Sequence, residues 1–300
     1  MNILLKKFFT FLKWTRYKEI LLLSSPGLMG LVLGKYSLFM AGHDGKLITM
    51  IVFFIALCLG GAHVFLFNLW SGIKLSTIDA AHIDYPLQQN EIHMNAIFML
   101  SFASLAFSLI INFLLNSSVF IASIIIAILW IFYAYPRGLF LKSHFIGGLA
   151  VHYINGSLHF LIGYFLFNNL TLNAVFISHY FSLIFLAGYF HHILKDRESD
   201  KLMKIKTLAT SCNPRIIFIT GNALFAASYL LLGLLVLMQI LPYSFFLWNT
   251  IIILLLVYRF RQTVKTDLSK EKILAYRKFY RFLYTLLGIL FVFSVYKGWP

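Results

Sequence analysis

The chain of 300 residues is 60% hydrophobic and only 12% charged, with a mean hydropathy of +0.84. These values leave too few polar side chains to cover a water-soluble globule of this size, while the 32 Phe and 16 Tyr exclude a disordered chain and two cysteines exclude a disulfide scaffold. The composition therefore indicates a polytopic membrane protein, and the net charge of +15 does not indicate nucleic-acid binding.

Roughly nine stretches of the chain have the length and apolar character of a membrane-spanning helix, which needs about 20 residues. The sequence thus predicts an all-α membrane protein in which residues 1–300 form a single integral membrane domain. Residues 1–19 form a basic segment at the N-terminus of this domain. The predicted spans cover residues 20–41, 47–70, 92–115, 119–135, 145–167, 172–194, 216–240, 245–258 and 279–296.

Basic residues are distributed unevenly over the predicted loops. With a cytoplasmic N-terminus, the loops on the same side lie near residues 71–91, 136–144, 195–215 and 259–278. All of the 25 basic residues except Lys35, Lys46 and Lys297 then lie on or beside that side. Because an excess of Lys and Arg marks cytoplasmic loops, the charge predicts a cytoplasmic N-terminus and contact with anionic lipid headgroups.

The acidic residues follow the same asymmetry, since only Asp44 of the ten lies on the opposite side. The loops on that opposite side are predicted to contain only a few residues each. Long polar loops are where functional sites are usually built. We therefore expect the functional site on the cytoplasmic face, in the loops near residues 71–91, 136–144 and 195–215.

The first polar segment runs from Asn68 to Ile92. Asp79, His82 and Asp84, together with Asn68, have side chains suited to holding a metal ion or a polar substrate. An ordinary interfacial loop has the same composition, so the segment alone leaves both interpretations open.

The second polar segment, Tyr133 to Lys142, follows the fourth predicted span. Its basic residues Arg137 and Lys142 are suited to binding an anion. As single residues, such side chains more often anchor a helix end among the lipid headgroups.

The third polar segment, Lys195 to Lys201, contains Asp196 and Asp200. On a helical end these two carboxylates, four residues apart, lie on one face. Such a pair can hold a Mg²⁺ ion that bridges to phosphate oxygens, and neighbouring Lys and Arg side chains can donate to the same phosphate. A solvated helix end with mixed charges is the alternative interpretation.

Four of the ten histidines, His63, His152, His159 and His179, lie within predicted spans. An ionisable residue inside a membrane is a candidate site residue, although a neutral histidine hydrogen-bonded between helices is equally consistent with the sequence. The sequence has no HExxH motif and no Cys/His spacing of a zinc site.

The order of the three polar segments, after the second, fourth and sixth spans, resembles the UbiA superfamily of intramembrane prenyltransferases. That family has a first motif of the form NDxxDxxxD, a YSxPPxRLK-like segment, and a DxxxD or DxExD motif followed by GxxTL. Here Asp196-Arg-Glu-Ser-Asp200 has the DxExD form and Thr207-Leu208 follow at the expected distance. The middle segment retains Tyr133, Pro136 and, with one inserted residue, Lys142.

The first motif departs from the family pattern. After Asn68, the chain has Leu69, Gly72 and Ser76 where the family has three aspartates. Asp79 replaces the last of them only if the loop has gained residues.

The resemblance implies helices around a central cavity and transfer of a prenyl group from an isoprenyl diphosphate to an aromatic or other lipophilic acceptor, with one or two Mg²⁺ ions. It also implies a bacterial inner (plasma) membrane protein whose active face is cytoplasmic and whose partners are these two substrates and membrane lipids. The implied site consists of Asp196 and Asp200 as catalytic and metal-binding residues, Asp79 as a further metal ligand, and Lys142, Asn68, Arg137 and Tyr133 as substrate-binding residues.

Two other functions remain compatible with the sequence. A terpene cyclase of the same fold would ionise a prenyl diphosphate and close the resulting cation on itself without an acceptor. A non-catalytic descendant would bind a lipid or a partner protein, and the altered first motif would be its natural outcome.

Overall fold

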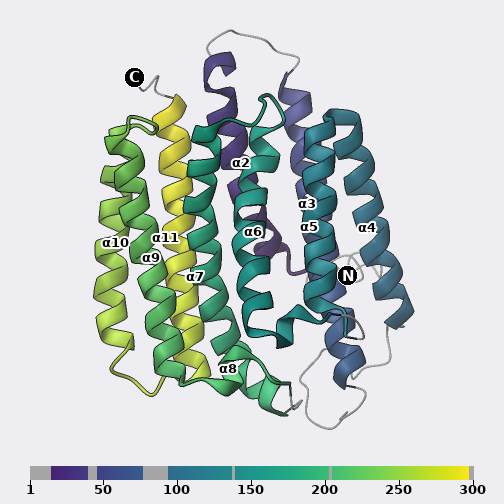
Figure 1. Ribbon diagram of the computed structural model, residues 1–300, viewed down its shortest axis with the longest axis vertical. Coiled ribbons are helices and arrows are strands. Elements are labelled where there is room, and N and C mark those ends of the chain that lie inside the picture. Colours follow the sequence, from purple (N-terminus) through teal and green to yellow (C-terminus); the bar gives the residue numbers. More distant parts are fainter. Residues whose placement is uncertain (1–14, 40–45, 77–93, 137–138, 203–204, 297–300) are drawn as a thin grey trace, which may run out of the picture. The chain divides into compact units, whose positions relative to one another are not determined.

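The computed structural model describes residues 15–39, 46–76, 94–136, 139–202 and 205–296, and in these ranges the chain is helical and contains no β-strand. This confirms the all-α prediction (Figure 1). The helices are α2 (Tyr17–Phe39), α3 (Lys46–Ser76), α4 (Met94–Leu115), α5 (Ser117–Ala134), α6 (Phe145–Tyr164), α7 (Leu172–Leu202), α8 (Leu208–Ser211), α9 (Pro214–Leu237), α10 (Tyr243–Thr263) and α11 (Lys270–Tyr296), with a 3₁₀ turn at Leu141–Ser143.

Within the described ranges, eight helices are long and apolar enough to cross a membrane, namely α3 to α7 and α9 to α11. The protein is therefore an integral membrane protein. The remaining long helix, α2, coincides with the first predicted span but is not among these eight. The ninth span thus stays a prediction.

Several helices extend beyond the apolar stretches from which they were predicted. The third helix, α3, continues to Ser76, α7 continues to Leu202, and α11 already begins at Lys270. These extensions contain Lys, Arg and Glu, which favour the helical backbone as strongly as most apolar residues do. The prediction that polar loops begin near 71 and 195 is therefore wrong at its boundaries, because the backbone there is still helical.

The described helices form two compact units. Unit 1 contains the described residues of Met1–Ser24 and Ala41–Lys142, and unit 2 contains those of Ser25–Met40 and Ser143–Pro300. The chain passes from the first to the second within α2, next to Pro26. The expectation of a single membrane domain stays a prediction.

In unit 1, α3 packs against both α4 and α5. Small polar side chains join these helices. Ser108 Oγ on α4 donates to the carbonyl oxygen of Ala56 on α3 at 2.8 Å, and Asn112 Nδ2 donates to Ser123 Oγ on α5 at 2.8 Å. Such hydrogen bonds stabilise helix contacts in a membrane, where no water competes for them.

In unit 2, α7 packs against α6 and α9 and, more sparsely, against α11 (Figure 1). Glycines allow the backbones to approach closely. A Cβ added at Gly156 of α6 would lie 2.6 Å from the Cα of Ser182 on α7, and one added at Gly163 would overlap the carbonyl oxygen of Gly27 on α2. Close contacts at small residues are typical of helix packing in membranes.

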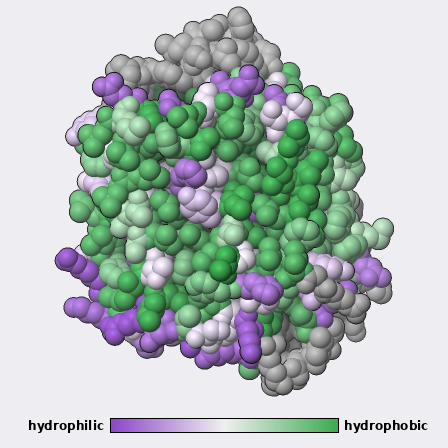
Figure 2. All heavy atoms as spheres, viewed as in Figure 1, coloured by the Kyte–Doolittle hydropathy of each residue, from purple (hydrophilic) through white to green (hydrophobic). Residues whose placement is uncertain are grey.

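Unit 2 is polarised by charge. From Ser143 onward, every charged residue in the described ranges lies at or near the end that holds the α7–α9 and α10–α11 connections. The connections at the other end, residues 165–171 and 238–242, contain no charged residue. Hydrophilic side chains accordingly gather at the lower left of Figure 2, below apolar helix flanks.

Candidate functional site

The last two turns of α7 carry the two carboxylates predicted to bind metal. Asp196 and Asp200 are one turn apart and share a face of the helix. Asp200 is only 1% exposed, whereas the Asp196 side chain is 27% exposed. Around Asp196, Lys195 Nζ lies 2.8 Å from Oδ1 and His192 Nε2 lies 3.4 Å from Oδ2.

The short helix α8 is fastened to this end of α7. Arg197 Nε donates to the carbonyl oxygen of Ala209 at 2.9 Å. Thr207, which is buried, caps α8: its Oγ1 accepts from the backbone N–H of Thr210, and the Thr210 hydroxyl in turn accepts from the Thr207 N–H. The Thr-Leu pair expected after the carboxylates therefore begins the short helix that Arg197 contacts, in the connection between α7 and α9.

The face of α7 that carries the carboxylates continues toward the middle of the helix with aromatic side chains. Tyr189 and Phe185 precede Asp196 by seven and eleven residues, about 10 and 16 Å along the helix axis. Their rings contact histidines of α6, with centroid distances of 4.1 Å from Tyr189 to His152 and 5.4 Å from Phe185 to His159.

In unit 1, the structure brings the end of α3 next to the end of α5. Ser71 Oγ donates to the carbonyl oxygen of Ala134. The rings of Trp70 and Tyr135 stack, with centroids 6.4 Å apart and 13° between their planes. Two of the three predicted polar segments are therefore neighbours at their helical ends, although nothing in the sequence spacing shows that they meet.

The predicted substrate-binding residues of unit 1 lie on these two elements or just beyond them. Asn68 is half-buried on α3. Tyr133 on α5 is 4% exposed and packs edge-on against Trp130 at 5.6 Å. Lys142 is half-buried in the 3₁₀ turn at Leu141–Ser143.

Two predicted site residues, Asp79 and Arg137, lie outside the described residues. The structure does add a cation that the sequence reasoning did not single out, because Lys74 Nζ lies 4.6 Å from the centroid of the Trp70 ring. The i, i+4 spacing of an aromatic and a basic residue was the available signal for this cation–π contact. Along the helical part of the first motif, Leu69 and Gly72 supply no carboxylate.

The chemistry of the donor set decides which metal it fits. Within the described ranges, no group of three or more His, Cys, Asp or Glu side chains lies together. The pair Asp196 and Asp200 therefore does not form a closed cage. Two carboxylates suit Mg²⁺, which keeps several water or phosphate oxygens and needs only one or two protein ligands.

Two of the histidines in predicted spans form side-chain hydrogen bonds with neighbouring helices. His63 Nδ1 on α3 is 2.9 Å from Ser101 Oγ on α4, and His179 Nδ1 on α7 is 3.1 Å from the hydroxyl of Tyr153 on α6. These contacts favour the packing interpretation for both residues.

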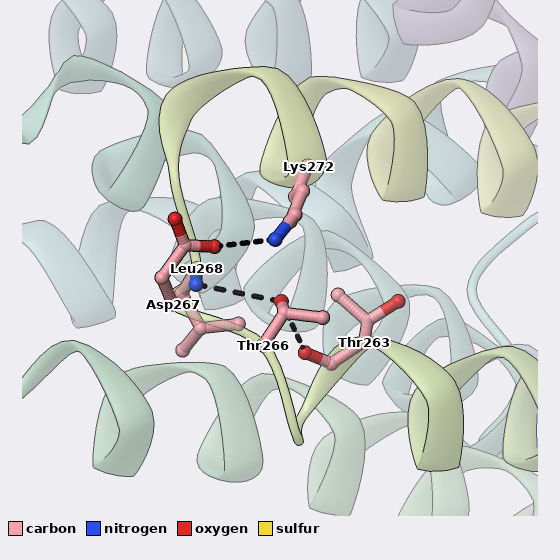
Figure 3. A network of polar contacts seen from close by, with 5 residues as sticks. All are labelled: Thr263, Thr266, Asp267, Leu268 and Lys272. Atoms are coloured by element: carbon pink, nitrogen blue, oxygen red, sulfur yellow. Dashed lines mark hydrogen bonds and ion pairs between the residues drawn. The ribbon is translucent and has the colours of Figure 1, made fainter.

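The α10–α11 connection contains another carboxylate, Asp267, which lies apart from the α7 pair in the sequence and is exposed to solvent. Lys272 Nζ donates to Asp267 Oδ1 at 2.7 Å, beside a turn in which Thr266 Oγ1 donates to the carbonyl oxygen of Thr263 (Figure 3). The hydrogen bond from Lys272 lowers the pKa of Asp267 below its usual value. Asp267 is thus charged at neutral pH and can serve as a comparison for the buried carboxylate.

The fold agrees with that of several solved structures. A digeranylgeranylglyceryl phosphate synthase is 19% identical with a TM-score of 0.69, covering 97% of this chain and 99% of that one. A UbiA homologue from Archaeoglobus fulgidus bound to GPP and Mg²⁺ is 18% identical with a TM-score of 0.68, covering 95% and 98%. A UbiA homologue from Aeropyrum pernix K1 is 14% identical with a TM-score of 0.62, covering 94% and 98%.

At these identities the structural likeness shows the fold alone. No curated protein matches the chain. The sequence model of the UbiA prenyltransferase family, however, matches residues 23–295, which is nearly the whole chain. The protein therefore belongs to the UbiA prenyltransferase family.

Proposed function

We propose that the protein transfers a prenyl group from an isoprenyl diphosphate to a lipophilic acceptor inside the membrane, with Mg²⁺ as the metal. The observation that carries this proposal is the pair Asp196 and Asp200 at the charged end of unit 2. One of these carboxylates is buried, and burial of an ionised carboxylate is unfavourable unless positive charge and hydrogen-bond donors compensate it. A UbiA homologue from Archaeoglobus fulgidus with a similar fold is bound to GPP and Mg²⁺, and such an ion would supply positive charge at this pair.

The reaction breaks the bond between C1 of the prenyl group and the diphosphate oxygen, and the electron pair leaves with the diphosphate. The acceptor then donates an electron pair to C1 and loses a proton. Mg²⁺, when bound by Asp196 and Asp200, supplies positive charge that stabilises the departing diphosphate. Lys142 is proposed to bind the diphosphate, with Asn68, Tyr133 and Arg137 as further substrate contacts and Asp79 as a further metal ligand.

The aromatic rings of Tyr189 and Phe185 continue the carboxylate-bearing face of α7 toward the membrane interior. Aromatic faces stabilise a neighbouring cation without reacting with it. They also provide an apolar wall for an isoprenyl chain. This arrangement fits an allylic intermediate formed just below the diphosphate. We further propose that the charged end of unit 2 faces the cytoplasm of a bacterial cell.

Replacing Asp200 with Asn tests the proposal. We expect Mg²⁺-dependent pyrophosphate release from geranyl, farnesyl or geranylgeranyl diphosphate to fall at least about 100-fold, because a metal-binding carboxylate is lost. The reaction is measured with the protein in lipid nanodiscs, with and without added acceptors.

Asp267→Asn is the matched control. It removes the same charge from an exposed carboxylate at the same end of unit 2, and we expect its activity to stay within about twofold of that of the unchanged protein. Equal activity of the Asp200→Asn variant would contradict the metal assignment. If the unchanged protein released no pyrophosphate from any of these donors, a non-catalytic binding role would replace the proposed reaction. Hydrocarbon products in the absence of acceptor would instead identify a cyclase.

A further inference from the structure

The connection between α5 and α6 contains a residue with an uncommon backbone conformation. Phe140 has a φ of 37°, in the left-handed region. Residues other than glycine avoid this region, because their Cβ comes too close to the following carbonyl oxygen, and a bulky residue there is a clear outlier. Such a conformation persists only where the surrounding structure prevents the chain from relaxing, and it is often found at functional sites.

The other non-glycine residues with a positive φ in the described ranges lie at the ends of α-helices. Arg16 directly precedes α2, Gln239 lies two residues after α9, and Leu268 lies two residues before α11. At Gln239 the conformation belongs to a closed helix end, where the Gln239 N–H donates to the carbonyl oxygen of Val236 at 2.9 Å. Phe140 lies six residues after the last residue of α5 and five before the first of α6, so capping of an α-helix does not explain it.

The residues directly after Phe140 form the 3₁₀ turn Leu141–Ser143, which contains Lys142. The helix α6 then begins at Phe145, after its N-cap residue His144. One residue therefore separates the turn from a long helix on one side, and Phe140 adjoins it on the other. The course of the backbone through Lys142 is determined by these two neighbours.

The exposure of the side chains changes at Phe140. Leu139, directly before it, is 56% exposed, whereas the residues from Phe140 to Ser143 are all half-buried. Residues 144–146 are exposed again. The left-handed residue is thus the first of a short segment that turns toward the protein, and partial burial of its ring offsets the unfavourable backbone conformation.

The backbone of residue 140 has a direct effect on Lys142. A lysine side chain is flexible, so its amine has a defined position only if the backbone that carries it is fixed. A change of φ from 37° to an ordinary helical value rotates the following chain by about 100°. Because α6 begins only five residues later, the 3₁₀ turn has to absorb this rotation, and Lys142 has to move.

We infer that Phe140 is a positioning residue for the diphosphate, because its left-handed backbone places the amine of Lys142 where it binds a diphosphate oxygen. Lys142 donates to the oxygen as a charged amine, and Phe140 itself touches no substrate. The role rests on the proposed function, in which Lys142 binds the diphosphate. It belongs to the backbone conformation at position 140, and the ring serves to hold that conformation.

The test compares Phe140→Ala with Phe140→Gly in the full-length protein in lipid nanodiscs. Both variants lack the ring, but only glycine adopts a positive φ without cost, so the backbone relaxes in the alanine variant. With saturating Mg²⁺, we expect the alanine variant to bind geranyl thiodiphosphate at least about tenfold more weakly than the unchanged protein, and the glycine variant to stay within about threefold. Equal losses in the two variants, or unchanged affinity in the alanine variant, would overturn the inference.

A double-mutant cycle with Lys142→Ala shows whether Phe140 acts through Lys142. Once Lys142 has been replaced, Phe140→Ala should change the affinity for geranyl thiodiphosphate by less than about twofold, because no amine remains to be positioned. Losses that add up in the double variant would show that Phe140 acts by another route. If Lys142→Ala alone leaves binding unchanged, Lys142 does not bind the diphosphate and the positioning role is wrong as well.

Gln239→Ala and Gln239→Gly are the matched controls, since Gln239 also has a positive φ but lies in the uncharged connection between α9 and α10. The glycine variant should have the higher melting temperature of the two, as it should at position 140. Both should bind geranyl thiodiphosphate within about twofold of the unchanged protein. A loss of affinity in Gln239→Ala as large as that in Phe140→Ala would show that binding follows general stability, against a positioning role.

Failure of the metal assignment is seen separately. If Asp200→Asn leaves Mg²⁺-dependent binding of geranyl thiodiphosphate unchanged while Phe140→Ala and Lys142→Ala weaken it, the metal site is wrong and the positioning role stands. If Asp200→Asn weakens binding and Phe140→Ala does not, the positioning role is wrong and the metal site stands.

Discussion

Single glycines determine how closely α2 and α6 approach in unit 2. A Cβ at Gly163 would overlap the carbonyl oxygen of Gly27, and a Cβ at Gly30 would overlap that of Phe160. These neighbours are backbone atoms, which cannot move aside as the end of a flexible side chain can. The two helices are therefore in contact through their backbones at these positions.

We expect Gly163→Ala to destabilise the protein by roughly 2–3 kcal/mol, because α2 must move away from α6. The melting temperature of the purified protein in detergent measures this effect. Gly288→Ala on α11 is the control, since a Cβ there would meet nothing within 4 Å. It should leave stability unchanged or raise it by up to about 1 kcal/mol through helix propensity. Equal losses in both variants would show that α2 and α6 are not closely packed.

At the scale of elements, the C-terminal end of α7 and the short helix α8 are joined by a side-chain hydrogen bond. Arg197 on α7 links the two helices through its hydrogen bond to Ala209, and Thr207 caps the N-terminus of α8. Asp196 and Asp200 flank Arg197 in the sequence. Their positions therefore depend on whether α8 stays folded against α7.

We expect Thr207→Ala to weaken Mg²⁺-dependent binding of geranyl diphosphate and to increase amide hydrogen exchange in α8, since the loss of a cap costs about 1 kcal/mol. Thr171→Ala removes the corresponding cap at the other end of α7, where Thr171 Oγ1 accepts from the N–H of Ala174 at 3.2 Å. It should cost similar stability and leave diphosphate binding unchanged. Unchanged exchange in α8 after the Thr207 substitution would refute the proposed coupling.

The sequence predicts the helices well but their ends poorly, and α7 shows why. Hydropathy falls at Leu194, where the apolar run ends, yet the helix continues to Leu202 because the charged residues that follow are good helix formers. The position of Asp196 and Asp200 on one face of the helix was predictable, since a spacing of four residues is close to one helical turn. The left-handed backbone of Phe140 was not predictable, because it depends on how the fold connects α5 to α6.

At the scale of the whole molecule, charge predicts orientation. The charged end of unit 2 should face the cytoplasm, because basic residues concentrate there. The sequence leads to the same orientation for the complete protein, because Lys and Arg concentrate in the loops predicted to be cytoplasmic. Neither inference depends on how the helices pack.

Cysteine labelling tests this orientation after Cys58 and Cys212 are replaced with Ser. We expect a membrane-impermeant maleimide to label Asn169→Cys, in the uncharged α6–α7 connection, in intact bacterial cells. Ser269→Cys, in the α10–α11 connection, should react only after the membrane is permeabilised. The reverse pattern would place the carboxylates of α7 on the outer side of the membrane.

The division of α2 between the two units has a consequence for synthesis of the protein. The second half of α2 belongs to unit 2, and Asn168 donates to the carbonyl oxygen of Gly34, which lies 134 residues earlier in the chain. A ribosome adding about 5–20 residues per second needs roughly 7–27 s to make that interval. During this time the face of α2 that carries Gly27, Gly30 and Gly34 is in the membrane before α6 has been made. A lipid or an insertion factor must therefore cover this face until α6 is inserted.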